Sequence, residues 1–104
     1  MTPPRISSTQ HPLVQTCKRL AANRHPARDG RILLDGPRLI EAALDAGATL
    51  EVALFAPDAA LSATHRAVAR LREAGIPVYP ATARVVQAAS TVTTSQGLVA
   101  IGRT

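Results

Sequence analysis

Apolar positions recur along the chain with helical spacing in some stretches and as short continuous runs in others. The first helical stretch runs from His11 to Asn23, with Pro12 at the first helical position, where its missing N–H costs nothing. The spacing predicts one apolar face, made by Leu13, Val14, Cys17, Leu20 and Ala21. Because Cys17 belongs to this face, we expect a buried structural thiol and not a nucleophile.

A short apolar strand is predicted over residues 31–35. A second helix follows from Pro37 to about Ala46, and Gly47 ends it. The apolar face of this helix is expected at Leu39, Ile40, Ala43 and Leu44. Residues 50–56 form another apolar run whose alternation is imperfect, so we expect a strand that is buried on both faces.

The second half of the chain continues the alternation of helix and strand. The predicted elements are a helical region over 57–75, a strand over 76–80, a helix over 83–89 capped by Thr82, a polar loop over 90–97 and a strand over 98–102. The inner edge of the helical region is expected at Leu61, His65, Val68, Leu71 and Arg72. Strands that alternate with helices predict an α/β fold with a mostly parallel sheet covered on both faces.

Length and composition fit one compact domain with an aliphatic core. The chain has 104 residues, of which 46% are hydrophobic, and it contains one Phe, one Tyr and one Cys. No apolar run reaches the roughly 18–20 residues that a membrane span needs, so we expect no membrane partner. The single cysteine excludes an internal disulfide and a cysteine-based metal cluster, and a cytoplasmic protein is the simplest interpretation. Because the chain ends directly after the last predicted strand, we expect it to be a domain of a longer protein.

The formal net charge of +5 is unevenly distributed. Residues 1–38 hold seven basic and two acidic side chains, whereas residues 39–104 hold five of each. A localised basic excess is the electrostatic signature of a polyanion site. A general preference for arginine explains why there is only one lysine, but it does not explain why acids are scarce in one part alone. The distribution therefore favours a polyanionic partner.

No catalytic constellation is visible. The chain has no G-x-S-x-G elbow, no Walker loop and no G-x-G-x-x-G, and its acids are scattered one per element. Its three histidines and one cysteine lack the spacing of metal ligands. We therefore expect a binding module that holds no metal and no cofactor.

The turn Asp35-Gly36-Pro37-Arg38 leaves two interpretations open. Free N–H groups at the start of the helix can hold an anion, with Arg38 one residue further on. Alternatively, the carboxylate of Asp35 satisfies the same N–H groups, and the turn is a self-capped helix start.

Three segments together resemble a known family. "ISSTQHPLVQTCKRL" (6–20), "RDGRILLDGPRLIEAAL" (28–44) and "STVTTSQGLVAI" (90–101) resemble, in this order, the N-terminal substrate-binding domain of SpoU/TrmH-type RNA 2'-O-ribose methyltransferases. Two positions depart from the family pattern: Ser95 stands where proline is frequent, and Ile32 where phenylalanine is frequent. The three segments span nearly the whole chain.

The resemblance implies an L30e/L7Ae-like three-layer α/β/α sandwich with a small mixed four-stranded sheet. It changes the expected sheet, because the last strand would run antiparallel to its neighbours. It also implies that the domain presents ribosomal RNA, or tRNA, to a following knotted methyltransferase domain. That second domain would hold S-adenosylmethionine, the catalytic arginine and the homodimer interface, so this chain alone would bind RNA without methylating it.

The matching segments also suggest which residues contact RNA. The candidates are Arg28, Arg31 and Arg38 first, then Lys18 and Arg19 on the first helix, then Gln96 in the closing loop. Two other functions remain open. One is a stand-alone RNA-binding protein of the L7Ae/L30e type, and the other is a protein-interaction module whose basic face meets an acidic partner.

Overall fold

A computed structural model of the chain describes residues 4–22, 30–59, 61–92 and 95–103. The elements are α1 (Pro12–Ala22), β1 (Arg31–Asp35), α2 (Pro37–Asp45), β2 (Leu50–Phe55), the 3-10 turn η2 (Pro57–Ala59), α3 (Ser62–Glu73), β3 (Val78–Pro80), α4 (Ala83–Ala89) and β4 (Leu98–Arg103). The helices and strands predicted from the pattern are therefore all present, with bounds that differ by a few residues.

The four strands form one mixed sheet in the order β1-β4-β2-β3. β2 and β3 are parallel, whereas β4 lies between β1 and β2 and is antiparallel to both. The mostly parallel sheet expected from the alternation alone is thus wrong, and the mixed sheet is confirmed. The physical reason is the place where the chain re-enters the sheet: β4 begins beside the ends of β2 and β3, since Leu98 pairs with Phe55 and Phe55 pairs with Pro80. The alternation of helices and strands does not show that the chain is still at this end after α4.

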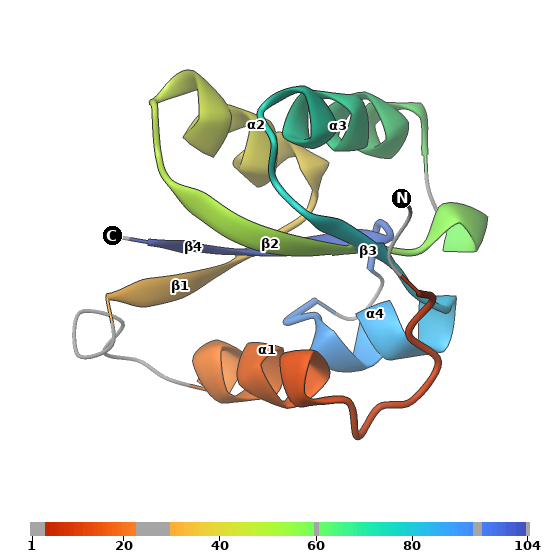
Figure 1. Cartoon of the computed structure of the whole chain (residues 1–104). Coiled ribbons are helices and arrows are strands. Elements are labelled where there is room, and N and C mark those ends of the chain that lie inside the picture. Colours follow the sequence, from red (N-terminus) through yellow and green to blue (C-terminus); the bar gives the residue numbers. More distant parts are fainter. Residues whose placement is uncertain (1–3, 23–29, 60, 93–94, 104) are drawn as a thin grey trace.

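Helices cover both faces of the sheet and make three layers (Figure 1). α2 and α3 lie on one face, and α1 and α4 lie on the other. Each face has its own aliphatic core. The buried residues of the α1/α4 side are Ile6, Val14, Cys17, Leu20, Leu54, Ala56, Ala81, Val85, Val86, Ala89, Val99 and Ile101. Those of the α2/α3 side are Leu34, Ile40, Leu50, Ala53, Phe55, Ala67, Val68, Leu71, Val78, Leu98 and Ala100.

The start of α3 differs from the prediction. Leu61 is extended and precedes the helix, and the buried face is formed by Thr64, Ala67, Val68 and Leu71. Three residues expected on the inner edge are exposed: Leu61, His65 and Arg72. The prediction counted large side chains and missed that small ones, Thr64 and Ala67, fill the space against the sheet. The rings of His65 and Phe55 form a T-shaped pair, with 5.5 Å between the ring centroids.

Two further predicted core positions are also exposed. Ala21 lies on the outside of α1, and Leu39 in α2 is 49% exposed. Two other predictions are confirmed. The thiol of Cys17 in α1 is buried, and β2 is buried on both faces of the sheet, because Ala53, Leu54 and Phe55 are buried in succession. Leu39 lies at the groove described next.

Candidate functional site

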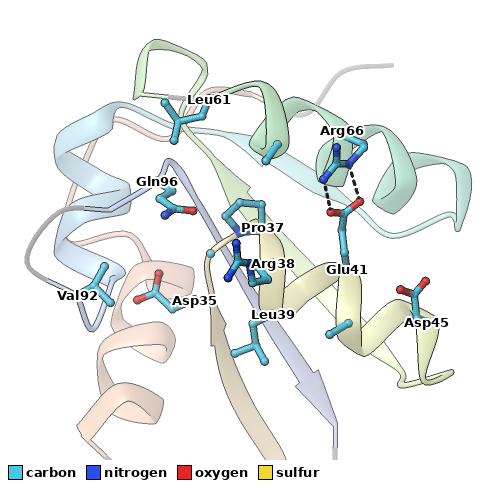
Figure 2. A pocket seen from close by; sticks show the side chains of 13 residues that line it. Asp35, Pro37, Arg38, Leu39, Glu41, Asp45, Leu61, Arg66, Val92 and Gln96 are labelled. Carbon is cyan, nitrogen blue, oxygen red and sulfur yellow. Dashed lines mark hydrogen bonds and ion pairs between the residues drawn. The ribbon is translucent and has the colours of Figure 1, made fainter.

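A groove of about 970 Å³ lies where the first turns of α2 and α3 meet the loop that precedes β4 (Figure 2). The lining residues come from α2 and its preceding turn, from the start of α3 and from the loop. They are Asp35, Gly36, Pro37, Arg38, Leu39, Glu41, Ala42, Asp45, Leu61, Ala63, Arg66, Val92 and Gln96. The turn that the sequence left ambiguous therefore forms one wall of the groove.

Gly36 makes the sharp corner between β1 and α2. Its φ of 99° is a left-handed conformation that residues with a side chain avoid, and its N–H donates to the carbonyl of Leu98 at 3.0 Å. Pro37 then occupies the first turn of the helix, where no N–H is needed. The corner is thereby held against the start of β4.

Asp35 does not cap α2, so the self-capped interpretation of the turn is wrong. Its Oδ2 accepts hydrogen bonds from the hydroxyl of Ser90 at 2.6 Å, from the N–H of Thr91 at 2.6 Å and from the hydroxyl of Thr91 at 2.8 Å. Gly36 is the N-cap of α2, and no side-chain capping hydrogen bond is present there among the residues that the structure describes. The carboxylate instead ties the end of β1 to the segment after α4, since the corner at Gly36 turns the helix away from it.

Hydrogen bonds also anchor residues 95–97, the part of the loop directly before β4. The buried hydroxyl of Thr64 donates to the carbonyl of Gln96 at 2.8 Å, and the N–H of Ser95 donates to the side chain of Gln87 at 2.8 Å. Ala56 donates to the carbonyl of Gly97 at 2.8 Å. These bonds fix the backbone from which the exposed Gln96 side chain enters the groove (Figure 2).

Ion pairs join α2 to α3 along the groove. Arg66 donates two hydrogen bonds of 3.2 Å to the carboxylate of Glu41, and Arg70 lies 3.6 Å from the same carboxylate and 2.6 Å from that of Asp45. The hydrogen bonds from Arg66, together with the charges of both arginines, lower the pKa of Glu41. Arg38 is exposed and makes no ion pair with any residue that the structure describes. It is the groove's available cation.

A second basic area lies at the opposite end of β1. Arg31 and Arg103 face each other in the β1–β4 register. Arg31 donates its Nε–H to Oε2 of Glu51 at 3.1 Å, and Nε of Arg103 forms an ion pair with the same oxygen at 3.3 Å. Two positive charges thus share one negative charge. α1 packs beside β1, so the charge of Arg31 also acts on Cys17 and lowers the pKa of its thiol, against the larger effect of burial. The last turn of α1, the start of β1 and the end of β4 lie together at this end of the molecule (Figure 1).

The six predicted contact residues therefore do not form one cluster. Arg38 and Gln96 share the groove, whereas Arg31, with Lys18 and Arg19 on the neighbouring helix, belongs to the other end of β1. Lys18 is half-buried and Arg19 is exposed. Arg28 lies outside the described residues. Arg66 and Arg103 were missed, since their partners are known only once α2 is placed beside α3 and β4 beside β1.

The described residues give no candidate for a metal site or for a membrane-spanning helix. Among them, no three His, Cys, Asp or Glu side chains come together as ligands for a metal ion. Within the same residues, no helix is both long and apolar enough to cross a membrane. The groove presents the guanidinium of Arg38 and the side-chain amide of Gln96, which have no ion pair and no side-chain hydrogen bond, respectively, among the described residues and so can contact a ligand.

Comparison with known proteins identifies the domain type. The model of the MRM3-like substrate binding domain family matches residues 11–100, which is most of the chain. The chain belongs to this family. The match confirms the resemblance to the substrate-binding domain of RNA 2'-O-ribose methyltransferases that the three sequence segments indicated. A search of curated proteins gives no significant match.

Solved structures agree with the assignment to the substrate-binding family. A crystal structure of an RNA 2'-O ribose methyltransferase is 30% identical, with a TM-score of 0.83 over 96% of this chain and 37% of that one. An rRNA methyltransferase from Sinorhizobium meliloti is 18% identical, with a TM-score of 0.74 over 100% of this chain and 38% of that one, and supports the fold. The chain spans little more than a third of either protein.

Proposed function

We propose that this substrate-binding domain binds RNA and presents it to a methyltransferase domain that modifies a ribose 2'-hydroxyl. The observation that carries the proposal is the family match over residues 11–100, supported by the 30% identity with an RNA 2'-O ribose methyltransferase. The basic excess in residues 1–38 gives the physical basis, because arginine and lysine contacts to phosphates dominate the affinity of most RNA-binding proteins.

The contacts proposed here are electrostatic rather than aromatic. Phe55 is 5% exposed and Tyr79 is packed against the α1/α4 core, so neither ring is available as a stacking platform. Arg38 at the groove and the pair of Arg31 and Arg103 at the other end of β1 provide two places for phosphates. An extended RNA strand can lie across both.

The test is the salt dependence of RNA binding by the whole chain. Fluorescence anisotropy with labelled ribosomal RNA fragments, between about 50 and about 200 mM salt, should give a log–log slope of about 0.7 to 0.9 per phosphate contact. Arg38→Ala should weaken binding and reduce the slope by one contact. The matched control is Arg84→Ala in α4, which removes an exposed arginine from the other layer. Weak binding without salt dependence contradicts the proposal.

The proposal extends to the parent protein. We propose that it is a SpoU/TrmH-type enzyme that acts on ribosomal RNA in the cytoplasm, and that a following knotted domain binds S-adenosylmethionine and forms the homodimer. The support is the resemblance of the three segments and the fact that the similar structures are much longer than this chain. The reading frame beyond Thr104 tests it. A frame without a methyltransferase domain favours a stand-alone RNA-binding protein instead.

A further inference from the structure

The groove is lined by an unusual set of apolar side chains. Of the described residues, the large hydrophobic ones that remain exposed are Leu39 (49%), Leu61 (58%) and Val92 (46%), and all three line this one groove. They come from α2, from the residue before α3 and from the loop before β4, and they lie on different sides of the turn that carries Arg38 (Figure 2). Because all three line one groove, a ligand with apolar faces that enters the groove would cover them.

Some polar side chains of the groove already have hydrogen-bond or ion-pair partners, and others have none among the described residues. Asp35 is held by Ser90 and Thr91, and the carboxylates of Glu41 and Asp45 are paired with Arg66 and Arg70. The guanidinium of Arg38 has no ion pair among the described residues. The side-chain amide of Gln96 likewise makes no hydrogen bond to a described residue, and its Oε1 lies 3.8 Å from the position that a Cβ on Gly36 would take. One cation and one amide are therefore presented beside apolar walls.

We propose that this groove binds unpaired nucleotides of the RNA, with base faces against the exposed apolar side chains on either side of the turn (Leu39, Leu61 and Val92), a base edge at the amide of Gln96 and a neighbouring phosphate at Arg38. The inference rests on the proposed function and names the class of RNA that it requires. A nucleotide combines apolar faces, a hydrogen-bonding edge and an anion. The faces are accessible only where the base is unstacked, as in loops, bulges and single strands. A groove of about 970 Å³ is ample for one nucleotide.

The arrangement does not suit a regular RNA duplex. The bases of a duplex are stacked, and its outer surface offers phosphates and 2'-hydroxyls that gain nothing from exposed leucine and valine. The basic end at Arg31 and Arg103 has no such apolar neighbours among the large exposed side chains of the described residues. We therefore assign base recognition and one phosphate contact to the groove, and further backbone contacts to the basic end.

The experiment compares three short RNA probes of equal length: a single strand of mixed sequence, the duplex that it forms with its complement, and an abasic strand that keeps the ribose-phosphate backbone. The whole chain should bind the single strand about tenfold more tightly than the abasic strand, because base faces are buried against aliphatic side chains. The double variant L39S/L61S should remove this preference and leave the affinity for the abasic strand unchanged. Q96A should reduce the preference partly.

The controls distinguish a failure of base recognition in the groove from a failure of RNA binding as a whole. The double variant changes two exposed side chains, so its melting temperature should stay close to that of the wild type, and V92S gives an independent check in the loop. If wild-type chain binds no RNA probe, both the proposed function and this inference fail. If it binds all three probes equally, or if the serine variants keep the preference, the base assignment alone is overturned and a protein segment becomes the better occupant.

Discussion

At the scale of single residues, Asp35 links the turn before α2 to the loop before β4. One of its oxygens accepts three hydrogen bonds from Ser90 and Thr91. Asp35→Ala should cost about 1 to 3 kcal/mol of unfolding free energy, the usual range when a hydrogen-bonded polar group loses its partner. Thermal unfolding should show a melting temperature that is lower by several degrees. RNA affinity should also fall, since the loop carries Val92 and Gln96.

Asp58→Ala is the matched control for Asp35→Ala. Asp58 also contacts a partner, Arg5 at 3.6 Å, but the side chains of the pair are 80% and 58% exposed. An exposed ion pair of this kind contributes about 0 to 1 kcal/mol. If both variants unfold at the same temperature, the three bonds at Asp35 contribute no more than a surface contact.

Cys17 gives a second prediction at this scale. Burial raises the pKa of its thiol from 9.0 to about 11, although the charge of Arg31 acts in the opposite direction. A thiol-specific reagent at about pH 8 should therefore label the folded chain slowly and the chain in denaturant rapidly, because the thiolate is the reactive form. As the only cysteine in the chain, Cys17 makes the labelling easy to interpret. Fast labelling without denaturant would contradict its burial.

The same pKa shift has a defined consequence for stability. Between about pH 9 and about pH 11 the unfolded chain loses the thiol proton while the folded chain keeps it. The folded state binds more protons in this range, so the free energy of unfolding decreases as the pH rises. C17A should show less of this alkaline decrease than the wild type.

At the scale of elements, the pair of helices α2 and α3 is joined by Glu41, Arg66 and Arg70. Because the pKa of Glu41 is lowered in the folded state, its ionisation stabilises the fold fully above the ordinary value of 4.5. This contribution decreases as the pH falls through the lowered value. Glu41→Gln should therefore lower the melting temperature by a few degrees at about pH 7, and the difference from the wild type should disappear in strong acid.

Glu73→Gln is the control for this helix pair. Glu73 is exposed at the end of α3 and makes no ion pair with a described residue, so its replacement should change the melting temperature little at either pH. A Glu41→Gln difference that persists unchanged into strong acid would mean that the lost stability comes from packing and not from the charge of Glu41.

The helices and strands of the structure show which features could be predicted from the sequence and which could not. Helix and strand positions followed from apolar spacing, since Pro12, Pro37 and Thr82 mark helix starts that the structure reproduces. The buried face of α3 followed only in part: Val68 and Leu71 were predicted correctly, but Thr64 and Ala67 were not, because these two residues carry little apolar signal. The direction of β4 did not follow from alternation either, and needed the resemblance of its segment to a known family.

The candidate site was harder to predict than the fold. Spacing placed Arg38 beside a turn and Gln96 in a polar loop, but only the sheet order brings these two residues to one groove. Apolar spacing predicts Leu39 as a core residue, but Leu39 is exposed, because a helical apolar position does not reveal whether a partner covers it. Long-range pairing, which apolar spacing does not encode, decides these features.

At the scale of the whole molecule, the cations proposed to contact RNA lie at two ends of one strand. Arg31 begins β1, and Arg38 follows it just after the corner. The four residue steps of the strand separate the two ends by roughly 13 Å. A single phosphate cannot reach both, so Arg31 and Arg38 should contact different phosphates of the same RNA and contribute independently.

This separation leads to a prediction for the double variant R31A/R38A. Each substitution should lower the affinity for RNA, and the two losses in binding free energy should add, because sites more than about 7 to 10 Å apart without shared partners are usually additive. The log–log salt slope should decrease by about 0.7 to 0.9 for each arginine. The melting temperature should fall by no more than a few degrees, because Glu51 keeps Arg103 as an ion-pair partner at 3.3 Å when Arg31 is removed.

The control is R72A/R84A, which removes the same charge from exposed positions on α3 and α4. If both double variants weaken binding equally, the RNA responds only to net charge. If R31A/R38A instead unfolds while its folded fraction binds normally, these arginines stabilise the fold and do not contact RNA.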